Sequence, residues 1–286
     1  MRTNTHLDWY RIQISFLFLS ILSSLFCGSS SSLGGERIYE FRSHSVEGEI
    51  YFLSNECKNK KKLLLFIHGS PGSASDFESY LKDKDLQKEF CMCLPDRLGY
   101  GNSFPKTSVP NVFLQGKAIH TALLHYLKKE GLFFKEGMVL GHSYGGPVAL
   151  VFAMEEDPSN SIVWKCLLLS SPIDPSLEEL YWYNRLANFG FVQWILPNSW
   201  VHSNEEMYTL KSDLERLTSK LGNQTFEIIS IHGENDSLVS PKNVYYFTKW
   251  KPNLNHRIQI LEDENHFIPW TSFQEIKNII LSEGNQ

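Results

Sequence analysis

The sequence predicts an α/β fold in which a mostly parallel, doubly wound sheet carries a helical cap insertion. Short continuous apolar runs, typical of strands buried on both faces, recur at 63–67, 90–94, 138–140, 166–169, 226–231 and 258–261. Segments of helical period lie between them at 75–81, 112–126, 146–155, 241–250 and 271–281. Strands that alternate with helices imply right-handed crossovers, and therefore a parallel sheet.

Two further stretches complete this plan. Residues 37–41 and 49–52 predict a hairpin of two strands at the start of the sheet, joined through Glu47 and Gly48. The stretch from about 173 to 224 has no clear strand pattern and is rich in aromatic residues. An insertion there would overhang the carboxyl edge of the sheet, where open α/β sheets hold their ligands. We expect its aromatic side chains to pack in a core, or secondarily to form an apolar wall for a substrate.

Length and composition favour one globular domain over 37–286. Of the 286 residues, 42% are hydrophobic and 21% are charged, which is not the composition of a disordered chain. The formal net charge is -5 and no run of Lys or Arg dominates a segment. Electrostatics therefore gives no reason to expect nucleic acid or anionic lipid as a partner.

The N-terminus resembles a secretory signal over residues 1–27. Arg2 and Arg11 precede an apolar stretch from 12 to 26, which is short for a bilayer span. Cys27 follows directly, as in a bacterial lipoprotein signal, although Phe26 stands where a small residue is expected. Lipidation of Cys27, conventional cleavage and an uncleaved anchor stay open, so we expect an exported protein that is membrane-anchored, periplasmic or secreted. Residues 28–36 would form a flexible tether.

Four further cysteines are expected to be buried structural thiols. Cys91 and Cys93 share one face of a predicted strand, Cys166 begins another apolar run, and Cys57 lies before the first of them. Free cysteine packs as a small hydrophobic residue, and no spacing typical of metal ligands occurs. We therefore favour free thiols over a disulfide or a metal site.

The strongest chemical signal is Gly141-His142-Ser143-Tyr144-Gly145, which follows a predicted strand and leads into a predicted helix. A serine on such a turn has a strained backbone, which the flanking glycines tolerate because they have no Cβ. The helix that begins there directs free N–H groups toward the place where an oxyanion would form. Ser143 is therefore the candidate nucleophile.

Partners for this serine follow in the chain. Serine needs an imidazole to accept its proton, and the imidazole needs a carboxylate that fixes its tautomer. His266 follows the last predicted strand, and Asp236 lies on the loop after the preceding one. Glu234 and Glu264 lie near these residues, and either could be mistaken for the acid.

An oxyanion loop is predicted at the end of the third strand, in His68-Gly69-Ser70-Pro71-Gly72. Its glycines let the chain turn back toward the nucleophile. The backbone N–H of Ser70, or less favourably that of Gly69, would act together with the N–H of Tyr144.

Taken together, these motifs resemble the α/β-hydrolase superfamily from about Ile38 to the C-terminus. The matching stretches are 68–72, 96–103, 141–145, 233–236 and His266. The order Ser, Asp, His is that of the superfamily, and its Gly-x-x-Asp pattern favours Asp236 as the acid. The resemblance implies a catalytic triad of Ser143, Asp236 and His266 that needs no cofactor and no metal ion.

The resemblance says less about the substrate. The superfamily contains esterases, lipases, carbon–carbon bond hydrolases, peptidases, acyltransferases, dehalogenases and epoxide hydrolases; the last two carry aspartate where this chain has Ser143. Proline iminopeptidases are similar in the oxyanion loop, but have a second glycine at the position of Ser70. We expect hydrolysis of an ester-like bond in a small or lipidic substrate through an acyl-enzyme. The alternatives are the other serine-dependent activities and a non-catalytic binding protein.

Several residues beside these motifs are expected to be structural. His68, His142 and His232 end strands, so each is expected to pack or to form hydrogen bonds rather than to catalyse. Asp96 and Arg97 share a turn and are expected to hold it by a salt bridge.

Overall fold

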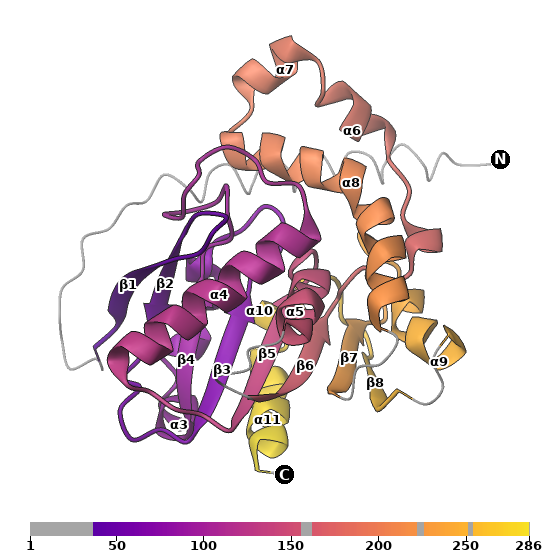
Figure 1. The fold of residues 1–286 in the computed structure, drawn as a ribbon. Coiled ribbons are helices and arrows are strands. Elements are labelled where there is room, and N and C mark those ends of the chain that lie inside the picture. Colours follow the sequence, from indigo (N-terminus) through magenta and orange to yellow (C-terminus); the bar gives the residue numbers. More distant parts are fainter. Residues whose placement is uncertain (1–36, 156–161, 222–225, 251–253, 286) are drawn as a thin grey trace. The chain divides into compact units, whose positions relative to one another are not determined.

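The computed structural model describes residues 37–155, 162–221, 226–250 and 254–285 of the chain (Figure 1). The predicted signal, Cys27 and the tether lie outside these residues. Within the described ranges, no helix combines the length and the apolar character that a membrane span requires.

An eight-stranded sheet in the order β1-β2-β4-β3-β5-β6-β7-β8 forms the centre of the protein (Figure 1). The strands are β1 Tyr39–His44, β2 Glu49–Ser54, β3 Lys62–Ile67, β4 Phe90–Pro95, β5 Glu136–His142, β6 Val163–Leu169, β7 Glu227–Gly233 and β8 His256–Leu261. β2 pairs antiparallel with both β1 and β4, and every later pairing is parallel. The predicted fold class, with its N-terminal hairpin, is confirmed.

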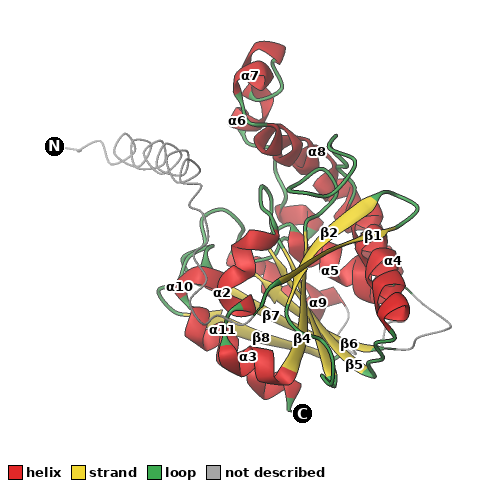
Figure 2. Ribbon diagram, turned by 90° about the vertical axis from the view of Figure 1, so that its left-hand side faces the viewer, coloured by secondary structure: helices red, strands yellow, loops and turns green. Residues whose placement is uncertain are grey.

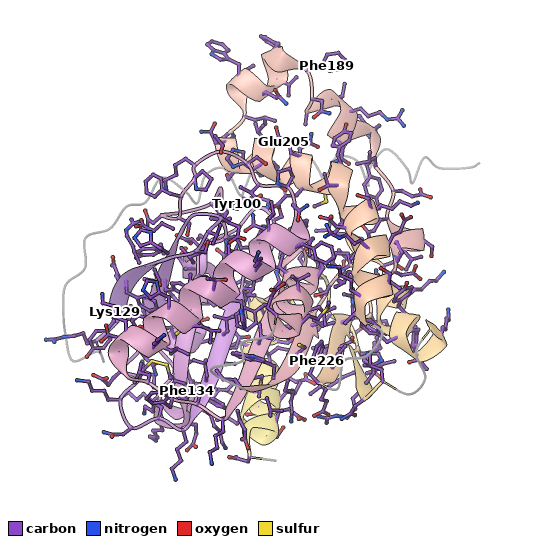
Figure 3. All side chains as sticks on the ribbon, in the orientation of Figure 1. Tyr100, Lys129, Phe134, Phe189, Glu205 and Phe226 are labelled. Atoms are coloured by element: carbon purple, nitrogen blue, oxygen red, sulfur yellow. A yellow bond between two sulfur atoms is a disulfide. The ribbon has the colours of Figure 1, made fainter. Side chains whose placement is uncertain are left out.

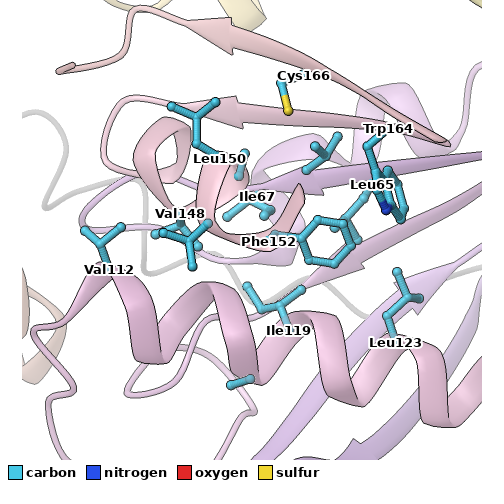
Figure 4. Close-up of a cluster of buried hydrophobic side chains, with 14 of the residues drawn as sticks. Leu65, Ile67, Val112, Ile119, Leu123, Val148, Leu150, Phe152, Trp164 and Cys166 are labelled. Carbon is cyan, nitrogen blue, oxygen red and sulfur yellow. The ribbon is translucent and has the colours of Figure 1, made fainter. Parts of the chain in front are cut away.

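Helices cover both faces of the sheet (Figure 2). One face packs against α4 Val112–Glu130, α5 Gly145–Met154 and α8 Asn198–Lys220. Figure 4 shows side chains of α4 and α5 in this core. The other face packs against η2 Ala74–Phe77, α2 Glu78–Leu81, α3 Lys84–Glu89, α10 Ile268–Thr271 and α11 Phe273–Gly284. Alternate residues of a strand serve the two cores: Leu65 lies in the first, whereas Leu64 and Phe66 lie in the second. This explains the continuous apolar runs of the sequence.

The ends of α4 show how local sequence sets an element. The side chain of Asn111 caps the first turn by accepting a hydrogen bond from the backbone N–H of Leu114. Gly131 ends the helix in the left-handed conformation at φ 65°. The crossover from β4 to β5 is thereby fixed at both ends.

The cap lies between β6 and β7, and the regular secondary structure of its described residues is helical. It consists of η3 Pro175–Leu177, α6 Trp182–Leu186, α7 Gly190–Ile195 and α8. The expectation that its aromatic residues pack in a core is wrong for Phe189, Phe191 and Trp194, which are exposed. Phe189 is labelled at the outer end of the cap in Figure 3. After β7, η5 Pro241–Tyr245 and α9 Tyr246–Trp250 lead to the last strand.

The prediction of free thiols is wrong for two of the cysteines. Cys57 and Cys91 form a disulfide, whereas Cys93 and Cys166 are buried free thiols, as expected. The loop after β2 brings Cys57 beside the start of β4, a long-range contact that residue spacing does not reveal. Burial raises the pKa of the Cys93 thiol to about 12, so this residue remains protonated and unreactive.

We expect reduction of the Cys57–Cys91 disulfide to lower the free energy of unfolding by about 3 to 4 kcal/mol. The reason is that the crosslinked residues are 34 positions apart, and their bond restricts the unfolded chain. Urea unfolding of the full chain, with and without a reductant, measures the effect. The double variant Cys57→Ser, Cys91→Ser is the control and should not respond to the reductant. Equal unfolding midpoints for the oxidised and reduced protein would contradict the prediction.

Candidate active site

Ser143 lies on a strained turn between β5 and α5. Its φ of 51° is in the left-handed region, which a serine rarely adopts. A Cβ at Gly141 would lie 2.3 Å from the carbonyl oxygen of Gly145, and one at Gly145 would lie 2.3 Å from that of Ile67. No side chain fits at either position, so both glycines are required for the close approach of strand and helix.

Backbone hydrogen bonds hold this turn in place. The N–H of Ser143 donates to the carbonyl of Leu169 on the neighbouring strand at 2.9 Å, and its own carbonyl accepts from Gly146 at 2.9 Å. Ser143 is half-buried and lies at the carboxyl edge of the sheet. Because the backbone is fixed on both sides, the hydroxyl has little freedom beyond rotation about its own bond.

The structure brings Asp236 and His266 together. Asp236 lies on the loop after β7 and His266 on the loop after β8, and the imidazole Nδ1 donates to the carboxylate Oδ2 at 2.8 Å. Both side chains are buried. Glu264 instead accepts a hydrogen bond from Thr271 at 2.6 Å, and Glu234 is exposed. Of the three acids considered in the sequence, only Asp236 contacts the imidazole.

Further donors fix the Asp236 carboxylate. His232 contacts Oδ2 from Nε2 at 3.0 Å, and the backbone N–H groups of Leu238 and Val239 donate to Oδ1 at 2.9 Å. Burial opposes ionisation of this carboxyl, but the hydrogen bonds from His232 and His266 outweigh it and hold the pKa below its usual range. Asp236 is therefore an ionised, fixed acceptor at neutral pH.

His142 orients the other side of His266. Its Nε2 lies 3.0 Å from the backbone carbonyl of His266, and the two ring centroids are 4.9 Å apart. Burial, with a smaller effect of neighbouring His266, lowers the pKa of His142 to about 3, so this ring is neutral. A neutral ring can donate Nε2–H to the carbonyl. The structural role expected for His142 is thus to anchor the loop of His266.

Ser143 and His266 are not hydrogen-bonded to each other in the part of the chain that the structure describes. Because Nδ1 of His266 is engaged by Asp236, its Nε2 is the nitrogen left to accept a proton from a hydroxyl. Hydrogen bonds between catalytic groups are often long without a substrate and tighten when one binds. The site therefore consists of two preformed parts. One is the turn that carries Ser143, here called the elbow, and the other is the Asp236–His266 pair.

The predicted oxyanion loop lies against the elbow. A Cβ placed on Gly69 would be 3.1 Å from the Cβ of Ser143 and 3.2 Å from Nδ1 of His142. Tyr144 follows Ser143 immediately and is the N-cap residue of α5. The hydroxyl of Ser70 is held by Tyr100 at 3.0 Å and by Glu206 at 2.5 Å. This loop is thus held by Tyr100 and by Glu206 of α8, and it also packs against Ser143.

Arg97 forms its salt bridge with Glu206 of α8, so the predicted pairing with Asp96 is wrong. The guanidinium Nη1 lies 2.5 Å from Glu206 Oε1, and both side chains are at most 1% exposed. Asp96 instead accepts hydrogen bonds from the backbone N–H of Ala74 at 2.7 Å and of Asn102 at 2.6 Å. Neighbouring residues at the end of a strand point to opposite sides, which separates the two side chains.

This buried pair connects the cap to the oxyanion loop. Arg97 also donates to the backbone carbonyls of His68 at 3.1 Å and Gly69 at 2.7 Å, while Tyr100 donates to Glu206 at 2.8 Å. Burial and the nearby Arg97 guanidinium lower the pKa of His68 well below its usual range. The neutral His68 ring accepts a hydrogen bond from the backbone N–H of Arg97 at 2.9 Å. Glu206 could not be singled out from the sequence, since nothing local distinguishes it from the other acidic residues of a charged helix.

The described residues contain one group that could hold a metal ion, formed by Cys57, Cys91 and Cys93. Two of its three sulfur atoms are joined in the disulfide. None of these three cysteines belongs to the candidate active site.

Comparisons with known proteins agree with this architecture. The sequence profile of the alpha/beta hydrolase fold matches residues 62–193. Curated proline iminopeptidases from Clostridium botulinum and Clostridioides difficile are each 32% identical over 123 residues, which is 43% of this chain and 39% of each relative. The chain therefore aligns with well under half the length of these relatives.

Solved structures extend the match over most of the chain. The 2-hydroxy-6-oxo-6-phenylhexa-2,4-dienoate hydrolase from Rhodococcus sp. strain RHA1 has a TM-score of 0.64 and 20% identity, covering 87% of this chain and 99% of that one. An esterase from Exiguobacterium antarcticum has a TM-score of 0.62 and 16% identity, covering 87% and 100%. The chain has the α/β-hydrolase fold, and its resemblance to the α/β-hydrolase superfamily is confirmed.

We expect Glu206→Gln to lower the free energy of unfolding by about 3 to 5 kcal/mol, because it leaves the Arg97 charge buried without a counter-charge. Chemical denaturation of the full chain measures this change. Glu205→Gln is the matched control, since Glu205 is the preceding residue of α8 and is partly exposed. It should change the free energy of unfolding by less than about 0.5 kcal/mol. Similar losses in the two variants would show that the buried pair is not what stabilises the cap.

Proposed function

We propose that the protein is a serine hydrolase that cleaves an ester-like bond of a small or lipidic substrate through an acyl-enzyme. The observation that carries this proposal is the juxtaposition of a strained Ser143 and a buried Asp236–His266 pair at the carboxyl edge of one sheet. A strained serine persists only where the surrounding structure enforces it, and such strain concentrates at functional sites.

The reaction proceeds in two steps. Ser143 Oγ attacks the substrate carbonyl carbon while His266 Nε2 accepts the hydroxyl proton, and the carbonyl oxygen becomes an oxyanion. The backbone N–H groups of Tyr144 and Ser70 stabilise that oxygen, with Gly69 as the less favoured donor; one such donor contributes about 3 kcal/mol. Breakdown expels the alcohol, which takes the proton from His266. A water molecule then attacks the acyl-enzyme by the same route and releases the acid.

Each fixed contact has a role in this scheme. The hydrogen bond from His266 Nδ1 to Asp236 selects the tautomer whose Nε2 accepts a proton, and the carboxylate stabilises the imidazolium that forms. His142 restrains the backbone carbonyl of His266, so the ring moves little. Substrate binding has only to complete the contact between Ser143 and His266. The chemistry needs neither a cofactor nor a metal ion.

A peptidase is the second candidate, because both curated relatives are named proline iminopeptidase. Their match covers 43% of this chain and 39% of each relative, so it does not by itself carry their named activity to this protein. Parallel assays with p-nitrophenyl esters of rising acyl length and with proline p-nitroanilide separate the two. We propose that ester turnover exceeds anilide turnover; the reverse order would favour the peptidase. Carbon–carbon bond hydrolysis and acyl transfer use the same triad and remain alternatives.

We expect a fluorophosphonate probe to label the folded protein at Ser143, because the probe forms a stable bond with an activated serine. Ser143→Ala should abolish both labelling and ester turnover, and Asp236→Asn should lower kcat on the order of 10⁴-fold. Ser219→Ala on the exposed surface of α8 is the matched control and should behave as the wild type. Mass spectrometry locates the label, and circular dichroism checks the fold. Folded wild-type protein that stays unlabelled would refute the proposal.

We propose further that the N-terminal segment directs export and attaches the protein to a membrane. The apolar run at 12–26 and the cysteine at 27 support this, and so does the Cys57–Cys91 disulfide, because structural disulfides persist in oxidising compartments. The mass of the mature protein from a bacterial host distinguishes the forms. We expect an N-terminus at Cys27 carrying acyl chains, and an unmodified Met1 in cytoplasmic protein would contradict export.

A further inference from the structure

The outer end of the cap carries an apolar surface that nothing in the described chain covers. It comprises Leu186, Phe189, Phe191, Trp194 and Ile195, here called the aromatic face. Phe191 is 73% exposed and Trp194 is 85% exposed. On α7, Phe191, Trp194 and Ile195 follow the spacing of one helix face. Figures 1 and 2 show α6 and α7 on the side of α8 that is remote from the sheet.

Polar contacts attach this part of the cap to α8. A surface helix usually packs its apolar face against the protein, and here the polar face does so instead. Asn204 of α8 receives a hydrogen bond from Asn184 at 2.9 Å and donates to Asn188 at 2.8 Å. Its amide also donates to the backbone carbonyl of Asn184, which the hydroxyl of Tyr208 contacts at 3.2 Å. The asparagine side of the segment therefore faces the protein, and the aromatic side faces outward.

The composition of the segment matches this orientation. Between 180 and 197, Arg185 is the only charged residue. Large exposed apolar surfaces mark sites that bind a protein or a lipid surface, because burying each large side chain is worth about 1.5 to 3 kcal/mol. Tryptophan and phenylalanine together with leucine and isoleucine are the residues that enter the boundary between lipid headgroups and acyl chains.

We propose that the aromatic face docks onto a lipid bilayer and enters its interfacial region. The N-terminal sequence identifies this occupant: an apolar run at 12–26 and Cys27 precede the described fold by the nine residues 28–36. Nine residues span at most about 30 Å, so an N-terminal anchor would keep the fold close to the bilayer at every moment. The inference rests on the export and attachment that we propose above. It does not depend on hydrolase activity.

Docking would add a second membrane contact to the N-terminal anchor. A second contact from a molecule that is already held at the membrane forms at a high effective concentration. The cap would then face the lipid, and α8 would lie between the bilayer and the oxyanion loop. The substrate class favoured by this geometry is an ester that partitions into lipid.

Tryptophan quenching by brominated lipid tests the proposal. The full chain is bound to phosphatidylcholine vesicles with or without bromine on the acyl chains, and fluorescence is compared. We expect brominated lipid to quench the wild type more than Trp194→Phe, because Trp194 contributes only to the wild type. The double variant Phe191→Ser, Ile195→Ser keeps Trp194 but loses apolar contacts with the lipid. We expect its quenching by brominated lipid to fall to the level of Trp194→Phe. The side chains changed are exposed, so circular dichroism should show an unaltered fold.

Phe133→Ser is the matched control, since Phe133 is 81% exposed and lies outside the cap, between α4 and β5. It should be quenched as the wild type is. Equal quenching in the wild type and Trp194→Phe overturns the proposal and leaves attachment to the N-terminus alone. A lipid-free dimer that Phe191→Ser, Ile195→Ser dissociates, again without quenching of Trp194, identifies a second copy as the occupant. None of these measurements requires turnover, so a failure of the hydrolase proposal would be seen separately in the probe experiment.

Discussion

The close packing of backbone around Ser143 is the constraint on which the candidate site depends. Gly141 and Gly145 allow β5, α5 and the end of β3 to meet where no Cβ would fit. The same packing forces Ser143 into a left-handed conformation and raises its side chain above the sheet. Parallel strands then bring the loops after β7 and β8 to the same edge, because their carboxyl ends coincide. The placement of Ser143, Asp236 and His266 at one edge of the sheet is thus set by the backbone.

Around this elbow, buried polar groups are satisfied by partners far away in the chain. Asp236 receives hydrogen bonds from two histidines and two backbone amides, and Arg97 is neutralised by Glu206. A buried ion pair contributes little net stability compared with apolar packing, but loss of one partner is severe. Such contacts determine where the side chains lie more than they add to the stability of the fold. They fix the predicted oxyanion loop and the His266 imidazole relative to Ser143, which the sheet already holds in place.

Sequence reasoning succeeded where the signal is local. Strand runs and the glycines at 141 and 145 follow from neighbouring residues, and the positions of Asp236 and His266 after their strands could be located in the same way. It failed for long-range contacts. The Cys57–Cys91 disulfide, the Arg97–Glu206 pair and the exposure of Trp194 each depend on which elements meet in space, and one sequence without that information offers only alternatives.

Helix α8 links the outermost part of the molecule to the innermost. Asn204 and Glu206 are two residues apart, which places them about 200° apart around the helix axis and about 3 Å apart along it. Asn204 therefore holds the asparagine contacts of α6 and α7, while Glu206 reaches inward to Arg97 and Ser70. One turn of α8 therefore carries both sets of contacts. The exposed tip of the cap and the loop beside Ser143 are held by the same rigid element of secondary structure.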